Sequence, residues 1–79
     1  LKSQFMTRRA TALAKLVAEE AGNNQQIQIE VAFGRTLSRQ PDARERELAE
    51  KILQGDDGTT NLMQFCHALL NLNEFVYIP

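Results

Sequence analysis

The adjacent residues Cys66 and His67 are the pair in this sequence whose side chains could most readily do chemistry. They are the single cysteine and the single histidine among 79 residues. A thiol beside an imidazole suggests a nucleophile with its base, part of a metal site, or part of a c-type haem attachment site. The apolar residues around them have helical spacing, and neighbours on a helix point about 100° apart. The two side chains therefore do not face each other as a catalytic pair.

The haem and zinc interpretations lack the other ligands that they need. Attachment of c-type haem requires Cys-x-x-Cys-His, and Met63 stands at the position of the first cysteine. A zinc site would have to take its remaining ligands from carboxylates, because the chain has no other thiol or imidazole. We expect Cys66 to pack in the core as a small apolar side chain and His67 to lie near the surface. We predict no metal ligand, no cofactor and no catalytic residue in this chain.

Acidic residues could supply general acid–base catalysis if an apolar environment raised the pKa of a carboxyl group. The acidic pairs at 19–20 and 56–57 instead lie at a solvated helix end and in a polar loop. The loop sequence DDGTTN has fewer acidic ligands than a calcium-binding loop and lacks its closing glutamate. These patterns predict a protein that is not an enzyme.

The charge balance argues against nucleic acid and lipid as partners. Nine basic and ten acidic residues give a formal net charge of −1, which provides no overall attraction for phosphates or anionic headgroups. A turn between two helices keeps helix-turn-helix-like nucleic-acid binding as a minor alternative, although the charges at 44–47 alternate in sign. No apolar run approaches the roughly 20 residues of a membrane helix, so we expect no membrane insertion.

Apolar spacing predicts a small all-α bundle of about four helices in a single domain, residues 1–79. The helices are expected at roughly 4–21, 25–38, 43–54 and 60–71, followed by a short extended C-terminal tail. Asn23 or Asn24 can cap the second helix, and Asp42 with Glu45 forms a capping-box pattern before the third. Residues 25–34 also alternate as a strand would, so a two-stranded ribbon with the tail is the alternative for this segment.

Two stretches carry a resemblance to a known family. They are VAFGRTLSRQPDARERELA at 31–49 and LMQFCHALLNLNEFVYIP at 62–79, with Gln4-Phe5-Met6 leading into the first helix. Together they resemble the C-terminal part of a domain of unknown function in large planctomycete multidomain proteins that also carry a cytochrome-c-like domain. The NLNEF segment is the most specific part of the match. One departure is Ser38, where the family often has glycine, so the helix end there must form in another way.

The resemblance implies that the chain is a C-terminal fragment of an exported, periplasmic parent protein. Any haem then belongs to another domain, and the family has no established catalytic residues to transfer to this chain. The partners implied are the other domains of the parent, or another protein. We expect a non-enzymatic structural or interaction module. The alternative is an accessory part of an active site whose catalytic residues lie upstream.

The candidate structural or interaction residues follow the last predicted helix or could pair with it. We expect the side chains of Asn71 and Asn73 to bond to backbone groups freed at the helix end. Glu74 could pair with Arg35 or Arg39, and Phe75 would help the tail to fold back on the bundle. The alternative is that these residues form an exposed recognition surface: Asn71, Asn73, Glu74, Phe75, Arg35 and Arg39.

Overall fold

The protein folds as four helices in a computed structural model that describes residues 2–55 and 57–76, with side chains for 4–55 and 57–73. The helices are α1 (Lys2–Ala21), α2 (Gln25–Leu37), α3 (Ala43–Leu53) and α4 (Gly58–Val76). The described residues contain no strand. The predicted small all-α bundle is thereby confirmed, and residues 25–34 are helical.

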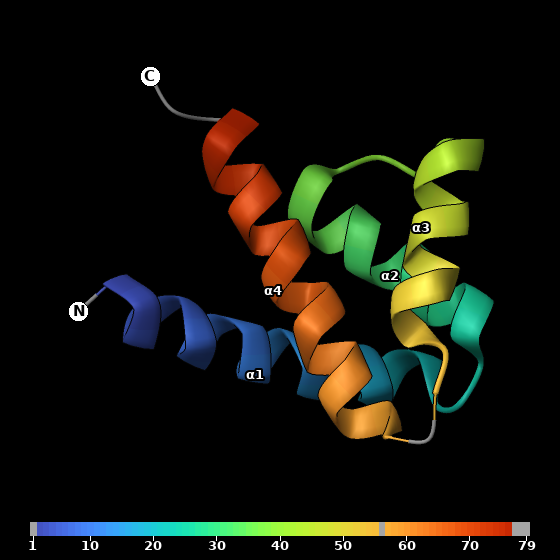
Figure 1. Cartoon of the computed structure of the whole chain (residues 1–79), viewed down its shortest axis with the longest axis horizontal. Coiled ribbons are helices and arrows are strands. Elements are labelled where there is room, and N and C mark those ends of the chain that lie inside the picture. Colours follow the sequence, from blue (N-terminus) through green and yellow to red (C-terminus); the bar gives the residue numbers. More distant parts are fainter. Residues whose placement is uncertain (1, 56, 77–79) are drawn as a thin grey trace.

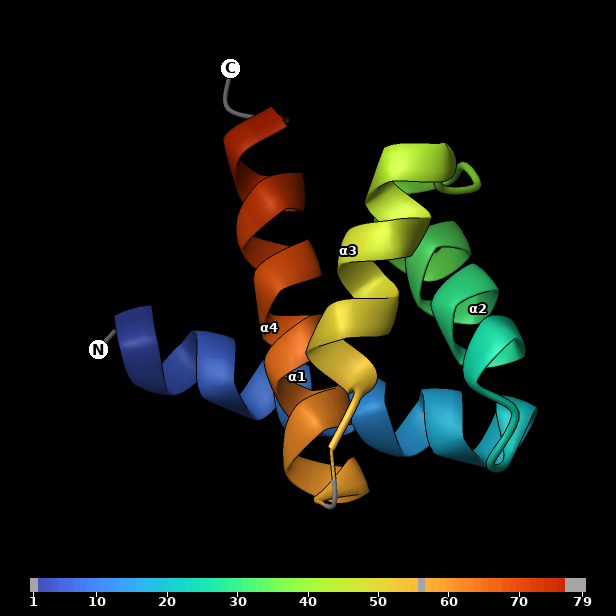
Figure 2. The same ribbon diagram turned by 45° about the vertical axis from the view of Figure 1, so that its right-hand side comes forward.

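The bundle is arranged around α4, which packs against each of the other three helices. Figure 1 shows α1 crossing α4, with α2 and α3 on the far side of α4 from the start of α1. In the turned view of Figure 2, α3 lies beside both α2 and α4, in agreement with the contacts between these pairs. Both α2 and α4 contact every other helix, and the contact between α1 and α4 is the most extensive in the bundle.

Side-chain caps define the beginnings of three helices. The Asn24 carboxamide oxygen accepts the backbone N–H of Ile27 at 3.1 Å and starts α2. Asp42 and Glu45 form the complete capping box that the sequence predicted for α3. Asp57 accepts the N–H of Thr60 at 3.2 Å at the start of α4. These caps satisfy N–H groups that have no partner within their own helix.

Two helix ends use the left-handed backbone conformation. After α1, Gly22 has φ 59°, which glycine adopts without steric cost. After α2, Ser38 has φ 57° and ψ 31°. The departure from glycine noted in the sequence is therefore accommodated by a serine that adopts the glycine-like geometry. A non-glycine residue in this region costs about 1–2 kcal/mol.

The core is a single apolar cluster to which all four helices contribute. Val17 of α1, Ile29 and Ala32 of α2 and Cys66 of α4 are completely buried. The rings of Phe33 and Phe65 meet in a tilted arrangement with their centroids 6.1 Å apart. The helical spacing within 25–37 places its apolar residues on the inner side of α2, and this burial explains why that segment is a helix rather than a strand.

The predicted bounds of the last helix were wrong at both ends. The helix starts at Gly58 rather than at residue 60, because Asp57 acts as the cap. It continues to Val76, so residues 72–76 are helical and not an extended tail. The asparagines were interpreted as a stop signal, but no glycine or proline follows them before Pro79. Residues 77–79 lie outside the described residues.

Candidate functional site

The end of α4 is connected to the end of α2 through Asn73. The Asn73 Nδ2 donates to the backbone carbonyl of Thr36, which belongs to the last turn of α2. Carbonyls in the last turn of a helix have no intrahelical donor. Thr36 is buried, and its own hydroxyl donates to the Ala32 carbonyl at 2.7 Å. Asn73 therefore supplies a donor that the C-terminus of α2 would otherwise lack.

This contact corrects the role predicted for the two asparagines. Both Asn71 and Asn73 lie within α4, and among the described residues no hydrogen bond joins either side chain to the end of its own helix. Asn71 is exposed, and its Nδ2 lies 3.1 Å from Nδ1 of His67, one turn earlier. The predicted bond to a freed helix carbonyl exists for Asn73, but the carbonyl belongs to a different helix. Sequence spacing alone does not show which helix end a side chain reaches.

Arg35 and Arg39 each form an ion pair with an acidic residue of another helix. Arg35 forms an ion pair with Glu20 of α1. The guanidinium of Arg39 donates twice to the carboxylate of Glu45, at 2.7 and 2.8 Å, and lies 5.8 Å from the centre of the Phe33 ring. The side chains of Glu74 and Phe75, the other two candidates, lie outside the described residues.

The bidentate contact with Arg39 changes the acidity of Glu45. Hydrogen bonds from Arg39 and from the backbone N–H of Asp42 lower the pKa of Glu45 from 4.5 to about 2. The carboxylate stays ionised at neutral pH and acts as both a cap and an ion-pair partner. These hydrogen bonds connect Arg39 in the turn after α2 to the first turn of α3, so Glu45 stabilises the α2–α3 turn.

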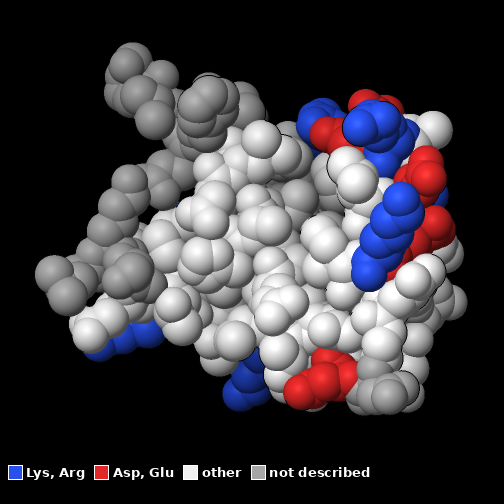
Figure 3. Space-filling view, in the orientation of Figure 1, with Lys and Arg blue, Asp and Glu red and all other residues white. Residues whose placement is uncertain are grey.

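A polar network continues along the contact between α2 and α3. Arg46 donates to the Gln26 carboxamide oxygen at 2.6 Å, and the Gln26 nitrogen donates to Glu50 at 2.6 Å. Arg46 also lies 3.7 Å from the carboxylate of Glu30. Charged residues are thereby concentrated on the α2 and α3 side of the molecule, as Figure 3 shows at its right edge.

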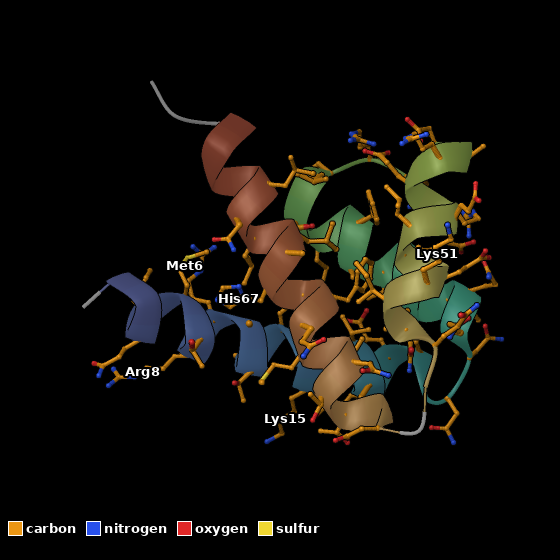
Figure 4. All side chains as sticks on the ribbon, viewed as in Figure 1. Met6, Arg8, Lys15, Lys51 and His67 are labelled. Atoms are coloured by element: carbon orange, nitrogen blue, oxygen red, sulfur yellow. The ribbon has the colours of Figure 1, made fainter. Side chains whose placement is uncertain are left out.

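Cys66 occupies the place that the sequence predicted for it. It is completely buried in the core cluster, and burial raises the pKa of its thiol to about 12. The thiol is therefore protonated at neutral pH and is not a nucleophile. His67, the next residue along α4, is half-buried (Figure 4). Within the described ranges, no three His, Cys, Asp or Glu side chains are grouped in a way that could hold a metal ion.

The outer side of α4 is a surface that lacks charge. Residues 58–73 contain no Lys, Arg, Asp or Glu. Four exposed residues spaced four apart run along this side: Thr60, Gln64, Ala68 and Leu72. On the neighbouring α3, Leu48 and Ile52 are 47% and 37% exposed. We call these six exposed residues, which lie on two helices that pack against each other, the α3–α4 face. Figure 3 shows the broad uncharged surface over α4.

A cavity that the sequence did not indicate lies between α1, the start of α2 and the start of α4. Its volume is about 560 Å³, and thirteen described residues line it. Ala14 and Ala18 lie on the α1 wall, and Gly22 adds no side chain. The signal available in the sequence is the spacing of four between these small residues. None of the described helices is long and apolar enough to span a membrane.

Comparisons with known protein families, with curated proteins and with solved structures give no match to this chain.

Proposed function

We propose that this chain is a non-enzymatic helical module that docks through the α3–α4 face onto another domain of a longer, exported protein. The observation that carries the proposal is the uncharged outer side of α4. A helix on the surface of a soluble protein usually presents charged and polar residues to the solvent. Here residues 58–73 of α4 carry no Lys, Arg, Asp or Glu, and the exposed Leu48 and Ile52 lie on the neighbouring α3.

The composition of the face suits a contact between domains. Interfaces within one chain are moderately polar, and the centres of protein interfaces are depleted in charged residues. The α3–α4 face combines large apolar side chains at Leu48, Ile52 and Leu72 with neutral polar groups at Thr60 and Gln64. Ala68 has a small side chain at the centre of the exposed row on α4, where a partner helix could approach closely.

The partner and the compartment come from the family resemblance. The segments that resemble the planctomycete family suggest a C-terminal position beside other domains in an exported protein. Docking onto those domains would bury the apolar part of the face. The alternative, an accessory role at an active site formed upstream, has no described residue in its favour, because the candidate residues with described side chains bond to other parts of this chain.

The test compares one substitution at two matched positions. Ala68→Glu places a charge on the α3–α4 face, and Ala12→Glu places the same charge at an exposed position of α1. In the isolated chain both changes should shift the free energy of unfolding by less than about 0.5 kcal/mol, because both sites are exposed. In the full-length protein, Ala68→Glu should lower the unfolding temperature of this module, and Ala12→Glu should not.

Differential scanning calorimetry of both lengths of chain provides the measurement. Equal effects of the two substitutions in the full-length protein would contradict docking through α4. A loss of stability of the isolated Ala68→Glu chain would show that the site is part of the fold and not of an interface.

A further inference from the structure

The cavity between α1, α2 and α4 has the size of a small-molecule site, with an apolar part and a polar part to its lining. Its volume of about 560 Å³ falls within the range of about 300–1,000 Å³ typical of ligand pockets. The space exists because Ala14, Ala18 and Gly22 provide little or no side chain at the place where α1 turns into α2. A ligand could therefore enter without moving a helix.

The inner wall of the cavity is apolar and adaptable. Leu53 and Leu62 belong to the buried core, and their side chains form part of this wall. Met63 is packed against the core, and its sulfur lies 3.4 Å from the Thr11 hydroxyl, which also bonds to the Thr7 carbonyl at 2.9 Å. A thioether side chain adjusts to ligands of different shapes. These residues favour the apolar body of a ligand.

The charged group at the cavity is a single lysine. Among the thirteen lining residues, Lys15 is the one ionisable side chain, and the wall contributes no carboxylate. Lys15 is exposed and forms no ion pair within the described residues. An ammonium group at the edge of an apolar wall favours a ligand with a negatively charged end.

We propose that this cavity binds a small amphipathic carboxylate. The carboxylate would pair with the Lys15 ammonium group, and the hydrocarbon part would lie on Ala14, Ala18, Leu62 and Met63. This inference does not depend on docking through the α3–α4 face, because the cavity opens beside α1 and can be tested in the isolated chain.

The experiment is a titration of the isotope-labelled chain with octanoate, followed by amide chemical shifts. Octanol and octylammonium are the neutral and cationic probes of the same chain length. Octanoate should give saturable shifts centred on residues 11–18 and 58–63 and should bind more tightly than either analogue. Lys15→Gln should weaken octanoate binding about fivefold and leave octanol binding unchanged, since an exposed ion pair contributes up to about 1 kcal/mol.

Two further variants make the result specific. Lys51→Gln removes the same charge from α3 and should not change octanoate binding, because Lys51 does not line the cavity and lies apart from Lys15 in Figure 4. Ala18→Leu should fill part of the cavity and weaken all three probes, while circular dichroism confirms that the helices remain. The proposal is overturned by an absence of saturable shifts, by octanol or octylammonium binding as tightly as octanoate, or by equal effects of Lys15→Gln and Lys51→Gln.

Discussion

Replacing Asn73 by alanine should destabilise the bundle, although the residue lies near the end of the last helix. The substitution removes the donor that Asn73 provides to the Thr36 carbonyl. Thr36 is only 9% exposed and the bond itself is partly buried, so water can replace that donor only in part. Leaving a buried acceptor without a partner costs about 1–3 kcal/mol.

One smaller effect reduces the expected magnitude. Alanine has a higher helix propensity than asparagine by up to about 0.7 kcal/mol, which offsets part of the loss at position 73. The net change in the free energy of unfolding should therefore be about 1–2 kcal/mol. For a chain of this size, such a change lowers the melting temperature by about 5–15 °C.

Asn71→Ala is the matched control, because it makes the same chemical change two residues earlier in the same helix. Asn71 is exposed, and its described side-chain partner is His67 within α4. We expect its free energy of unfolding to change by less than about 0.5 kcal/mol. Asn73→Asp provides a second test, because a carboxylate has a similar shape but no N–H to donate, and it should destabilise at least as much as Asn73→Ala.

Thermal and urea unfolding followed by far-ultraviolet circular dichroism would measure these differences. Equal melting temperatures for the Asn71→Ala and Asn73→Ala chains would refute the inter-helix bond as a source of stability. A stable Asn73→Asp chain would refute it independently.

Two other predictions concern the turns around α2 and α3. Ser38→Gly should raise the melting temperature by about 4–8 °C, because it relieves about 1 kcal/mol of strain from the left-handed backbone at Ser38. Gly22→Ala should lower the melting temperature, because Gly22 has φ 59°. An unchanged melting temperature in either variant would contradict this reasoning. The lowered pKa of Glu45 adds stability that is complete above its ordinary value of 4.5 and is lost as the pH falls toward 2. The Glu45→Gln chain should therefore have a lower urea midpoint than the native chain at pH 7 and the same midpoint near pH 2. Glu47→Gln is the control, because Glu47 belongs to an exposed ion pair whose charged atoms are 4.0 Å apart. Its urea midpoint should differ little from that of the native chain at either pH.

The parts of the fold that depend on local chemistry could be predicted from the sequence. Asn24 and the pair Asp42 and Glu45 are caps whose hydrogen bonds span three residues, so sequence spacing is sufficient to identify them. The burial of Cys66 followed from the apolar spacing around it. In each case the partner groups lie within one or two helical turns.

The features that depend on how helices cross could not be predicted in the same way. Asn73 donates a hydrogen bond to a carbonyl 37 residues earlier in the chain, and Arg35 of α2 forms an ion pair with Glu20 of α1. The cavity beside Lys15 exists because three helices meet where α1 has small residues. The end of α4 was missed for a related reason. A short polar residue ends a helix only when no tertiary contact stabilises the helix beyond it. Asn73 makes such a contact, so α4 continues past it.

The Asn73 contact also distinguishes the docking module from its rival, an accessory part of an upstream active site. If Asn73 serves the fold, Asn73→Ala in the full-length protein should reduce the folded yield and the melting temperature of this module by the amount measured in the isolated chain. If the residue serves an active site instead, the same variant should fold normally and lose turnover. Asn71→Ala again controls for the substitution itself. Because an N–H of the Asn73 carboxamide bonds to the Thr36 carbonyl, we expect the first outcome, and a normally folded full-length variant with reduced activity would favour the rival.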